Sequence, residues 1–259
     1  MIMSLSSEHQ NNLLHADDPP PAGYLAPTQR PEILIICEHA GLAIPKRLDR
    51  LGFSSDFDLS QQHIAWDIGG ASLSRKIADQ LGAGLIWQNY SRLVIDCNRR
   101  PLSPQSIREE SDHVPIPGNI GLSAAEKQAR VDEIFQPYDN LCRREMARPE
   151  IKLVVCIHSF TAEMDGFSRP WHMSFLYRNG GVYARQMAAF ILADDPDLII
   201  GFNEPYQVDD QTDWFVIQHA EPKGVPQVLI EVRNDQLRKD VNIDLWAKRL
   251  SDACLKMLS

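Results

Sequence analysis

Short apolar runs, rich in β-branched residues, alternate along the chain with longer stretches in which apolar residues recur every three or four positions. Several of the short runs are apolar at nearly every position, which is typical of central strands covered on both faces. We therefore expect strands at 32–37, 84–88, 92–96, 152–157, 174–177, 197–200 and 227–232.

Helices are predicted between these strands. Residues 68–81 carry their apolar side chains on one face and are followed by Gly82, which favours a helix end. A second helix is expected to begin at Ser123, because Glu126 three positions later completes a capping box. Two more are expected at about 182–193 and at the C-terminal end of the chain. Strands that alternate with helices predict an α/β fold, a three-layer sandwich with a mixed, mostly parallel central sheet.

The chain divides into a polar beginning and one continuous domain. Residues 1–30 are polar and contain the run Pro19-Pro20-Pro21, so we expect an N-terminal arm or tail there. No linker-like stretch, repeat or low-complexity segment follows. Residues 31–259 are therefore predicted to form a single α/β domain that carries the functional site.

Composition and charge narrow the class of protein. The 259 residues carry a formal net charge of −9, which argues against a nucleic-acid or anionic-membrane partner, although a local arginine cluster still allows a small anionic substrate. No apolar run reaches the roughly 18 residues of a membrane-spanning helix, and the first residues do not have the pattern of a secretory signal. The five cysteines show no disulfide spacing, so we expect a cytoplasmic protein. The oligomeric state is left open.

Chemically active side chains follow the predicted strands. His39 comes just after 32–37 and His158 just after 152–157. Asn98 and Arg99 follow the run that ends at residue 96, and Glu231 lies inside the last apolar run. Because ligands bind at the carboxyl ends of strands in such sheets, we expect these side chains to meet at one edge.

Two histidines and one carboxylate form a common catalytic zinc set. Asp67, near the start of the first predicted helix, adds a carboxylate, although an acid there also suits the helix dipole. Glu231 is costly to bury in an apolar strand unless it is paired or functional, so it is the candidate general base. The alternative for each histidine is a buried structural role.

Arginine and asparagine side chains suggest an anion site beside this set. Arg99 can hold a carboxylate through two hydrogen bonds, and Asn98 adds a neutral donor. Arg92 lies six positions before Asn98, so both side chains face the same side if the strand continues. We expect Arg92 to polarise a scissile carbonyl or to join the anion clamp. The alternative is a surface arginine paired with an acidic side chain.

These residues lie in segments that resemble the N-formylglutamate amidohydrolase family. The matching segments run in the family order over nearly the whole chain after residue 30. They are EHAGLAIP, HIAWDIGG, SRLVIDCNRRP, IHSF, FSRPWHMSFLY and HAEPKGVPQVLIEVRND. The family is more distantly similar to zinc carboxypeptidases and aspartoacylase-like deacylases, which implies a zinc-exopeptidase-like α/β fold with one Zn²⁺ per chain.

The resemblance also implies roles for individual residues. His39 and His158 match zinc ligands, and Glu231 matches the general base. Arg92, Asn98 and Arg99 match the residues that hold the carbonyl and the carboxylate of the substrate. The carboxypeptidase-like pattern has a Glu three positions after the first His, where this chain has Leu42. We take Asp67 as the third ligand, with Glu38 as the alternative. We also expect Arg169, His219 and Arg233, with His172, to shape the substrate site.

The leading hypothesis is a zinc-dependent amidohydrolase that cleaves a small anionic N-acyl amino acid. The resemblance implies N-formyl-L-glutamate as the substrate, with formate and glutamate as products, as in histidine degradation. The chain lacks the serine-hydrolase elbow, the phosphate loop and the dinucleotide fingerprint. The alternatives are a deacylase of another N-acyl amino acid, a non-catalytic metabolite-binding relative, and an amidase that uses Cys37 or Cys156 as nucleophile.

Overall fold

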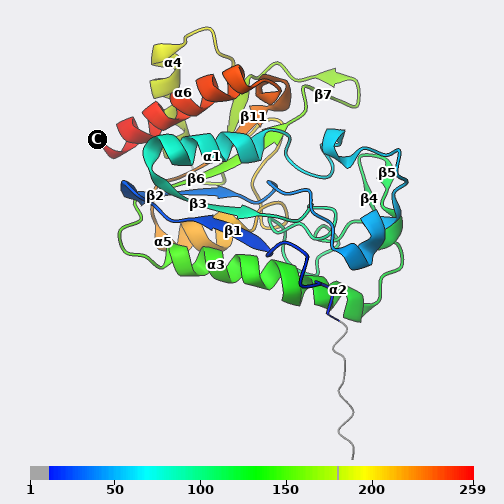
Figure 1. Ribbon diagram of the computed structural model, residues 1–259. Helices are drawn as coiled ribbons and strands as arrows, with labels where there is room; N and C mark the ends of the chain where they lie inside the picture. Colours follow the sequence, from blue (N-terminus) through cyan, green and yellow to red (C-terminus); the bar gives the residue numbers. More distant parts are fainter. Residues whose placement is uncertain (1–11, 180) are drawn as a thin grey trace, which may run out of the picture.

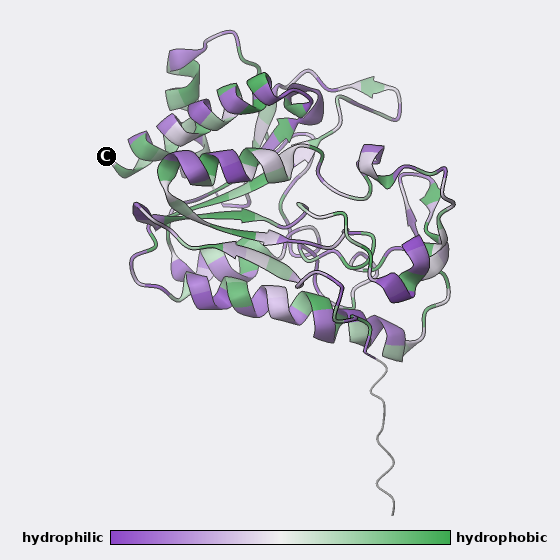
Figure 2. Cartoon of the chain, in the orientation of Figure 1, coloured by the Kyte–Doolittle hydropathy of each residue, from purple (hydrophilic) through white to green (hydrophobic). Residues whose placement is uncertain are grey.

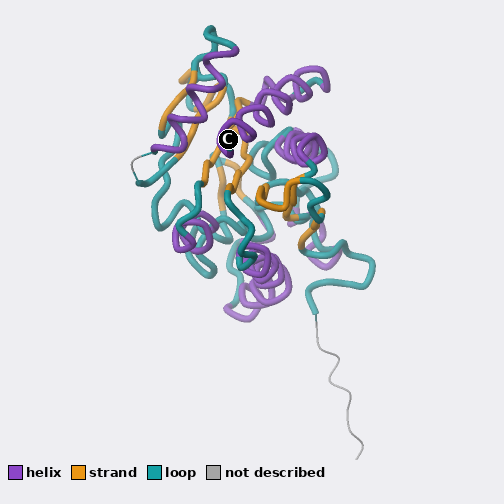
Figure 3. The backbone as a smooth tube through the Cα atoms, turned by 90° about the vertical axis from the view of Figure 1, so that its left-hand side faces the viewer, coloured by secondary structure: helices purple, strands orange, loops and turns teal. Residues whose placement is uncertain are grey.

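A mixed, mostly parallel sheet lies between two helical layers in the computed structural model (Figure 1). The structure describes residues 12–179 and 181–259. The helices are α1 (Gly70–Leu81), α2 (Ala124–Arg130), α3 (Gln136–Met146), α4 (Val182–Asp194), α5 (Glu221–Lys223) and α6 (Asp240–Leu258). Helices α1, α4 and α6 lie on one face, and α2, α3 and α5 lie on the other (Figures 1 and 3). The predicted α/β sandwich is confirmed.

The central sheet has seven strands in the order β1-β3-β2-β6-β11-β9-β10. The four strands β3, β2, β6 and β11 run parallel, whereas β1 and β9 are antiparallel to their neighbours β3 and β11. Their bounds are β1 (Ala22–Leu25), β2 (Arg30–Cys37), β3 (Ala83–Gln88), β6 (Leu153–Phe160), β9 (Met173–Leu176), β10 (Ile200–Phe202) and β11 (Gln227–Arg233). The parallel strands therefore end at a common edge.

Two small hairpins and the longest loops lie beyond that edge, on the right of Figure 1. The hairpins are β4 (Glu110–Ser111) with β5 (Val114–Pro115), and β7 (Glu163–Met164) with β8 (Phe167–Ser168). Loops at this edge are free to carry polar side chains, because they do not have to complete the sheet.

The apolar run 92–96 is not a strand, so this prediction is wrong. Residues 92–94 form a turn in which the Val94 amide donates to the Ser91 carbonyl at 2.9 Å. The outer edge of β3 pairs with residues 22–25 instead, which excludes another strand from that edge. The apolar side chains of the run are buried in a cluster under the loops.

The segment predicted as an N-terminal arm contributes an edge strand to the sheet. β1 pairs with β3 along its whole length, from Ala22 opposite Gln88 to Leu25 opposite Leu85. Residues 1–11 lie outside the described part of the chain. The division of the chain at residue 30 stays a prediction.

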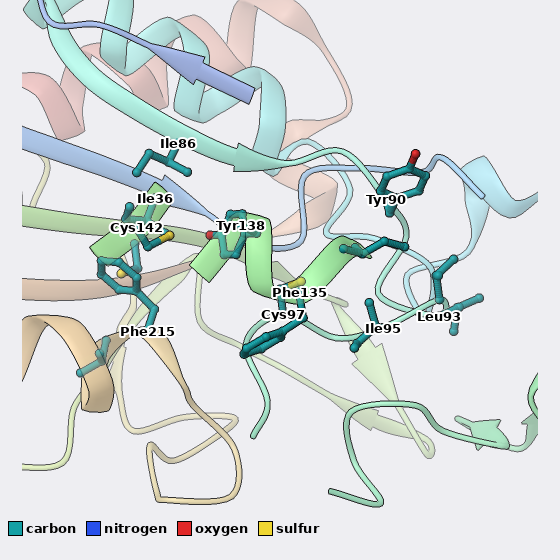
Figure 4. Close-up of a cluster of buried hydrophobic side chains, with 14 of the residues drawn as sticks. Ile36, Ile86, Tyr90, Leu93, Ile95, Cys97, Phe135, Tyr138, Cys142 and Phe215 are labelled. Atoms are coloured by element: carbon teal, nitrogen blue, oxygen red, sulfur yellow. The ribbon is translucent and has the colours of Figure 1, made fainter. Parts of the chain in front are cut away.

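Two apolar cores fill the space on either side of the sheet, and the strands are correspondingly hydrophobic (Figure 2). Alternation along β6 sends Val155 and Ile157 towards α1 and α6, and Cys156 to the opposite core. His158 lies two positions after Cys156 in β6, so its side chain projects from the same face of the sheet. Figure 4 shows the core on this second side, where Ile36 of β2, Tyr138 and Cys142 of α3 and other large side chains pack together. This core also includes apolar residues of the loops beyond the sheet edge, such as Leu93 and Ile95.

Helix α1 begins at Gly70, three residues after Asp67, and the capping residue before it, Gly69, has a positive φ. Gly69 has φ of +85°, and a Cβ built there lies 2.3 Å from the Leu237 Cβ. Any side chain at this position therefore combines backbone strain with a clash against the segment that follows β11.

We predict that Gly69→Ala lowers the free energy of unfolding by about 2 kcal/mol or more, since strain and clash add. Gly121→Ala is the matched control, because Gly121 has φ of +71° with nothing within 4 Å of a built Cβ. Urea unfolding of the two variants gives the comparison. Equal losses of stability would show that the contact with Leu237 contributes nothing.

Candidate metal and active site

A cavity of about 410 Å³ opens at the carboxyl ends of the parallel strands. His39 follows β2, His158 lies near the end of β6 and Glu231 near the end of β11, and all three line this cavity. The remaining walls come from loops around residues 63–67, 92–112 and 206–213. Its volume is in the range of small-molecule sites. Strand exits that are distant in sequence thus share one solvent-accessible space.

Two histidines and one aspartate converge at the bottom of the cavity. The His39 and His158 Nδ1 atoms lie 3.2 Å apart, and the Asp67 Oδ2 atom lies 3.3 Å from the first and 2.9 Å from the second. Ligand atoms at about 2.0–2.1 Å from a tetrahedral zinc lie about 3.3 Å from one another. All three residues are buried. Their chemistry and spacing fit a metal ion with three protein ligands.

The outer nitrogens of both rings face carboxylates. His39 Nε2 lies 2.8 Å from the Asp96 Oδ1 atom, an arrangement that fixes the ring and the tautomer of metal-binding histidines. His158 Nε2 lies 3.2 Å from the Glu38 Oε2 atom, but without the alignment of a hydrogen bond, so the attraction is mainly ionic. Glu38 therefore lies behind His158, and only Asp67 lies between the two histidines.

Electrostatics inside the cluster favour ionised Asp67 and Asp96. Burial alone would raise the pKa of both carboxyl groups. His39 and His158 lower the pKa of Asp67, while Arg92 and His39 lower that of Asp96. Both carboxyl groups therefore have a pKa below their ordinary value, which keeps Asp67 in the form that binds a cation.

Glu231 lies beside the cluster with one unpaired oxygen and, unlike Glu38, lines the cavity. Its Cα lies opposite His158 on one neighbouring strand and Ser174 on the other. The Oε2 atom is buried without a hydrogen-bond partner in the described residues. Burial raises the pKa of Glu231 to about 7, with opposing contributions from His158 and Asp67. A carboxylate of this kind can take up and release a proton near neutral pH.

Arg92 lies above the cluster, held by its carboxylates. Its Nη2 and Nε atoms donate to the Asp96 Oδ2 atom at 2.8 and 3.2 Å, and its Nη1 atom donates to the Asp67 Oδ1 atom at 3.4 Å. The prediction that Arg92 and Asn98 face the same side of one strand is wrong, because residues 92–96 are not extended. Both residues line the cavity nevertheless.

The Asn98 side chain forms hydrogen bonds with other residues of the protein. Its Nδ2 atom donates to the Asp213 Oδ2 atom at 3.0 Å, and its Oδ1 atom accepts from the backbone amides of Trp214 and Phe215 at 2.9 and 3.1 Å. Arg99 donates from Nη1 to two backbone carbonyls, whereas its buried Nε has no partner in the described residues. Arg99 therefore retains hydrogen-bond donors for a ligand. Asn98 instead binds residues 213–215 and holds that segment of the cavity wall in place.

Four residues predicted near the substrate do not line the cavity. Arg169 donates to Thr161 and to the Tyr206 hydroxyl, and Arg233 donates to the Arg169 carbonyl. His172 accepts a backbone amide in the loop before β10. His219 lies 2.7 Å from the Asp139 Oδ1 atom, which also accepts from the Trp214 indole at 2.8 Å. Arg169 therefore contacts two residues of the cavity wall, Thr161 and Tyr206, whereas the partners named for the other three side chains do not line the cavity.

The cavity also contains residues that the sequence patterns did not reveal. Arg108, Tyr206 and Asp213 line it, and Asp96 lies directly behind Arg92 and His39. The segment that matches SRLVIDCNRRP includes Asp96, so a motif-based signal existed for this residue. Arg108 and Tyr206 lie in loops with no recognisable motif.

The cysteine-nucleophile alternative has little support. Cys37 and Cys156 are fully buried. Burial raises the pKa of the Cys37 thiol to about 12 and that of Cys156 well above its ordinary value. Neither residue lines the cavity, so neither supplies an accessible thiolate.

Residues 32–238 match the family described as N-formylglutamate amidohydrolase. The gene product Atu2144 from Agrobacterium tumefaciens is 31% identical to this chain, and its crystal structure superposes with a TM-score of 0.88 over 95% of this chain and 98% of its own. The N-formylglutamate amidohydrolase from Ralstonia eutropha JMP134 is 14% identical and shares the fold, with a TM-score of 0.67 over 91% of this chain and 96% of its own. No curated protein sequence matches the chain.

No helix in the described ranges has the length and apolar character needed to cross a membrane. The family match spans most of the chain and includes every strand exit that contributes to the cavity. The chain belongs to the N-formylglutamate amidohydrolase family and is an amide hydrolase of that type.

Proposed function

We propose that this protein hydrolyses N-formyl-L-glutamate to formate and L-glutamate and that it uses one zinc ion per chain. The observation that carries the proposal is the meeting of three metal-ligand atoms with a separate, unpaired carboxylate, Glu231, in one cavity. The family match supports the choice of substrate. The five cysteines are free thiols, which supports a cytoplasmic location.

His39, Asp67 and His158 would hold the metal. A zinc ion bound there supplies Lewis-acid chemistry, lowering the pKa of a water molecule and polarising the scissile carbonyl. The ring contacts of Asp96 and Glu38 keep the two imidazoles oriented, so the ligand atoms are positioned before the ion arrives.

Glu231 moves the proton in this scheme. It accepts a proton from the attacking water as the oxygen adds to the formyl carbon, and it delivers that proton to the amine nitrogen as the C–N bond breaks. Its pKa, raised to about 7 mainly by burial, suits both steps. Arg92 stabilises the negative charge that develops on the formyl oxygen, since its guanidinium lies against Asp67.

Arg99 would orient the substrate by binding its carboxylate, because Arg99 retains unpaired donors at the wall of the cavity. We assign Asn98 a positioning role, because its side chain fixes the backbone of 214 and 215. We assign Arg169 a positioning role as well, because it donates to Thr161 and Tyr206 in the cavity wall, whereas His219 and Arg233 lie outside the lining.

The purified protein is expected to release formate from N-formyl-L-glutamate. Removal of metal with 1,10-phenanthroline should lower turnover by about 100-fold or more, because the attacking water loses its activation, and added zinc should restore it. Formate release measures this directly. Turnover that survives complete metal removal would contradict the metal-dependent mechanism. Hydrolysis of other N-acyl amino acids but not of the formylglutamate would change the proposed substrate.

Glu231→Gln should lower kcat by about 10²- to 10⁴-fold while the metal content stays unchanged, since Gln keeps the shape but cannot carry the proton. Glu163→Gln is the matched control, because Glu163 is an exposed glutamate in β7 outside the cavity lining. Steady-state kinetics and metal analysis of both variants check the assignment. A variant at position 231 that turns over at the wild-type rate would remove Glu231 from the mechanism.

A further inference from the structure

Three guanidinium groups line the same cavity, and they differ in how the protein satisfies them. Arg92 is bound by Asp96 and Asp67. Arg99 is held by backbone carbonyls on one side only. The Arg108 guanidinium makes no hydrogen bond or ion pair with any residue in the described ranges, and its Nε atom is buried. Among the residues that the structure describes, Arg108 thus has no partner for its guanidinium.

The electrostatic setting of Arg108 is unfavourable without an added anion. Burial lowers the pKa of its guanidinium, and the neighbouring charges of Arg92 and Arg99 lower it further. A buried, unpaired donor near two like charges costs free energy that an anionic ligand recovers on binding. Asp96 offsets part of this lowering of the pKa, but no ion pair joins the Arg108 guanidinium to a carboxylate within the described ranges.

Arg108 is held in place through its backbone. Its carbonyl accepts from the Asn119 Nδ2 atom at 2.7 Å, and Asn119 is fully buried. The Oδ1 atom of Asn119 in turn accepts from the buried Arg130 side chain at 2.7 Å. The loop that presents Arg108 is therefore anchored to helix α2, although the guanidinium itself is free.

Arg92 and Arg108 also share a small recess of about 10 Å³, lined by Gln105 and Ser111 as well. This volume corresponds to about one water molecule. Arg108 therefore lies beside the arginine that contacts the ligand cluster, and it lines the same cavity as His39 and His158.

We propose that Arg108 binds the side-chain carboxylate of the substrate and makes the site selective for N-acyl derivatives of acidic amino acids. The proposal rests on the proposed function, because it places the scissile amide at the histidine cluster. Arg99 then holds the α-carboxylate, which is closer to the amide, and the second carboxylate reaches Arg108. A planar guanidinium suits this contact because it forms two parallel hydrogen bonds with a carboxylate.

The test compares a substrate with its neutral isostere. Arg108→Gln should lower kcat/KM for N-formyl-L-glutamate by about 10- to 100-fold and leave that for N-formyl-L-glutamine within about 3-fold. Arg108→Lys keeps the charge and should recover part of the preference. Arg100→Gln is the matched control, since Arg100 is exposed and outside the cavity lining. Equal losses on both substrates, or no loss on either, would overturn the role of Arg108.

A binding measurement separates this inference from the proposed function. Calorimetric titration with L-glutamate and L-glutamine needs no turnover. The wild-type protein should prefer L-glutamate, and Arg108→Gln should lose that preference by the same factor as in the kinetic comparison. If the wild-type protein hydrolyses neither formyl compound but shows this binding pattern, the proposed function fails and the role of Arg108 stands. Absence of any preference in the wild-type protein overturns the role of Arg108.

Discussion

Burial of several ionisable groups in one small volume is the constraint on which the site depends. His39, His158, Asp67, Asp96, Glu38 and Glu231 are all buried, and isolated charges at such positions are very costly. They are tolerated because each ring nitrogen faces a carboxylate or the other ring, and Arg92 bridges two of the carboxylates. A divalent cation between three of these atoms would offset the remaining negative charge, and metal binding would then stabilise the site.

The sheet explains why these groups can be brought so close. Parallel strands β2, β6 and β11 are adjacent, so their ends deliver side chains from positions 39, 158 and 231 to one edge. Asp67 comes from the loop that precedes α1. Its backbone amide donates to the His39 carbonyl at 2.9 Å, which holds this loop beside the end of β2. The apolar core under the loops, formed by Tyr138 and its neighbours, supports this edge from below (Figure 4).

Strand periodicity is sufficient to predict the parallel strands β2, β3, β6 and β11 and the side chains near their ends, but not the edge strand β1. The strand predicted at 92–96 does not form, because residues 22–25, about 70 positions earlier in the chain, pair with the edge of β3. A local sequence pattern does not show which of two distant segments will pair with an edge. The placement of Asn98 and His219 depends on partners at 213–215 and 139, which are distant in sequence. Sequence patterns do not predict the position of Arg108, because it depends on a loop anchored through Asn119 and Arg130.

Zinc K-edge X-ray absorption of the purified wild-type protein, combined with metal stoichiometry, determines whether His39, Asp67 and His158 bind a metal. We predict one zinc per chain, bound by two imidazole nitrogens and oxygen ligands at about 2.0–2.1 Å. His158→Ala should lose that signature. A protein that takes up no zinc, or zinc bound through sulfur, would contradict the convergence of His39, Asp67 and His158 as a metal site.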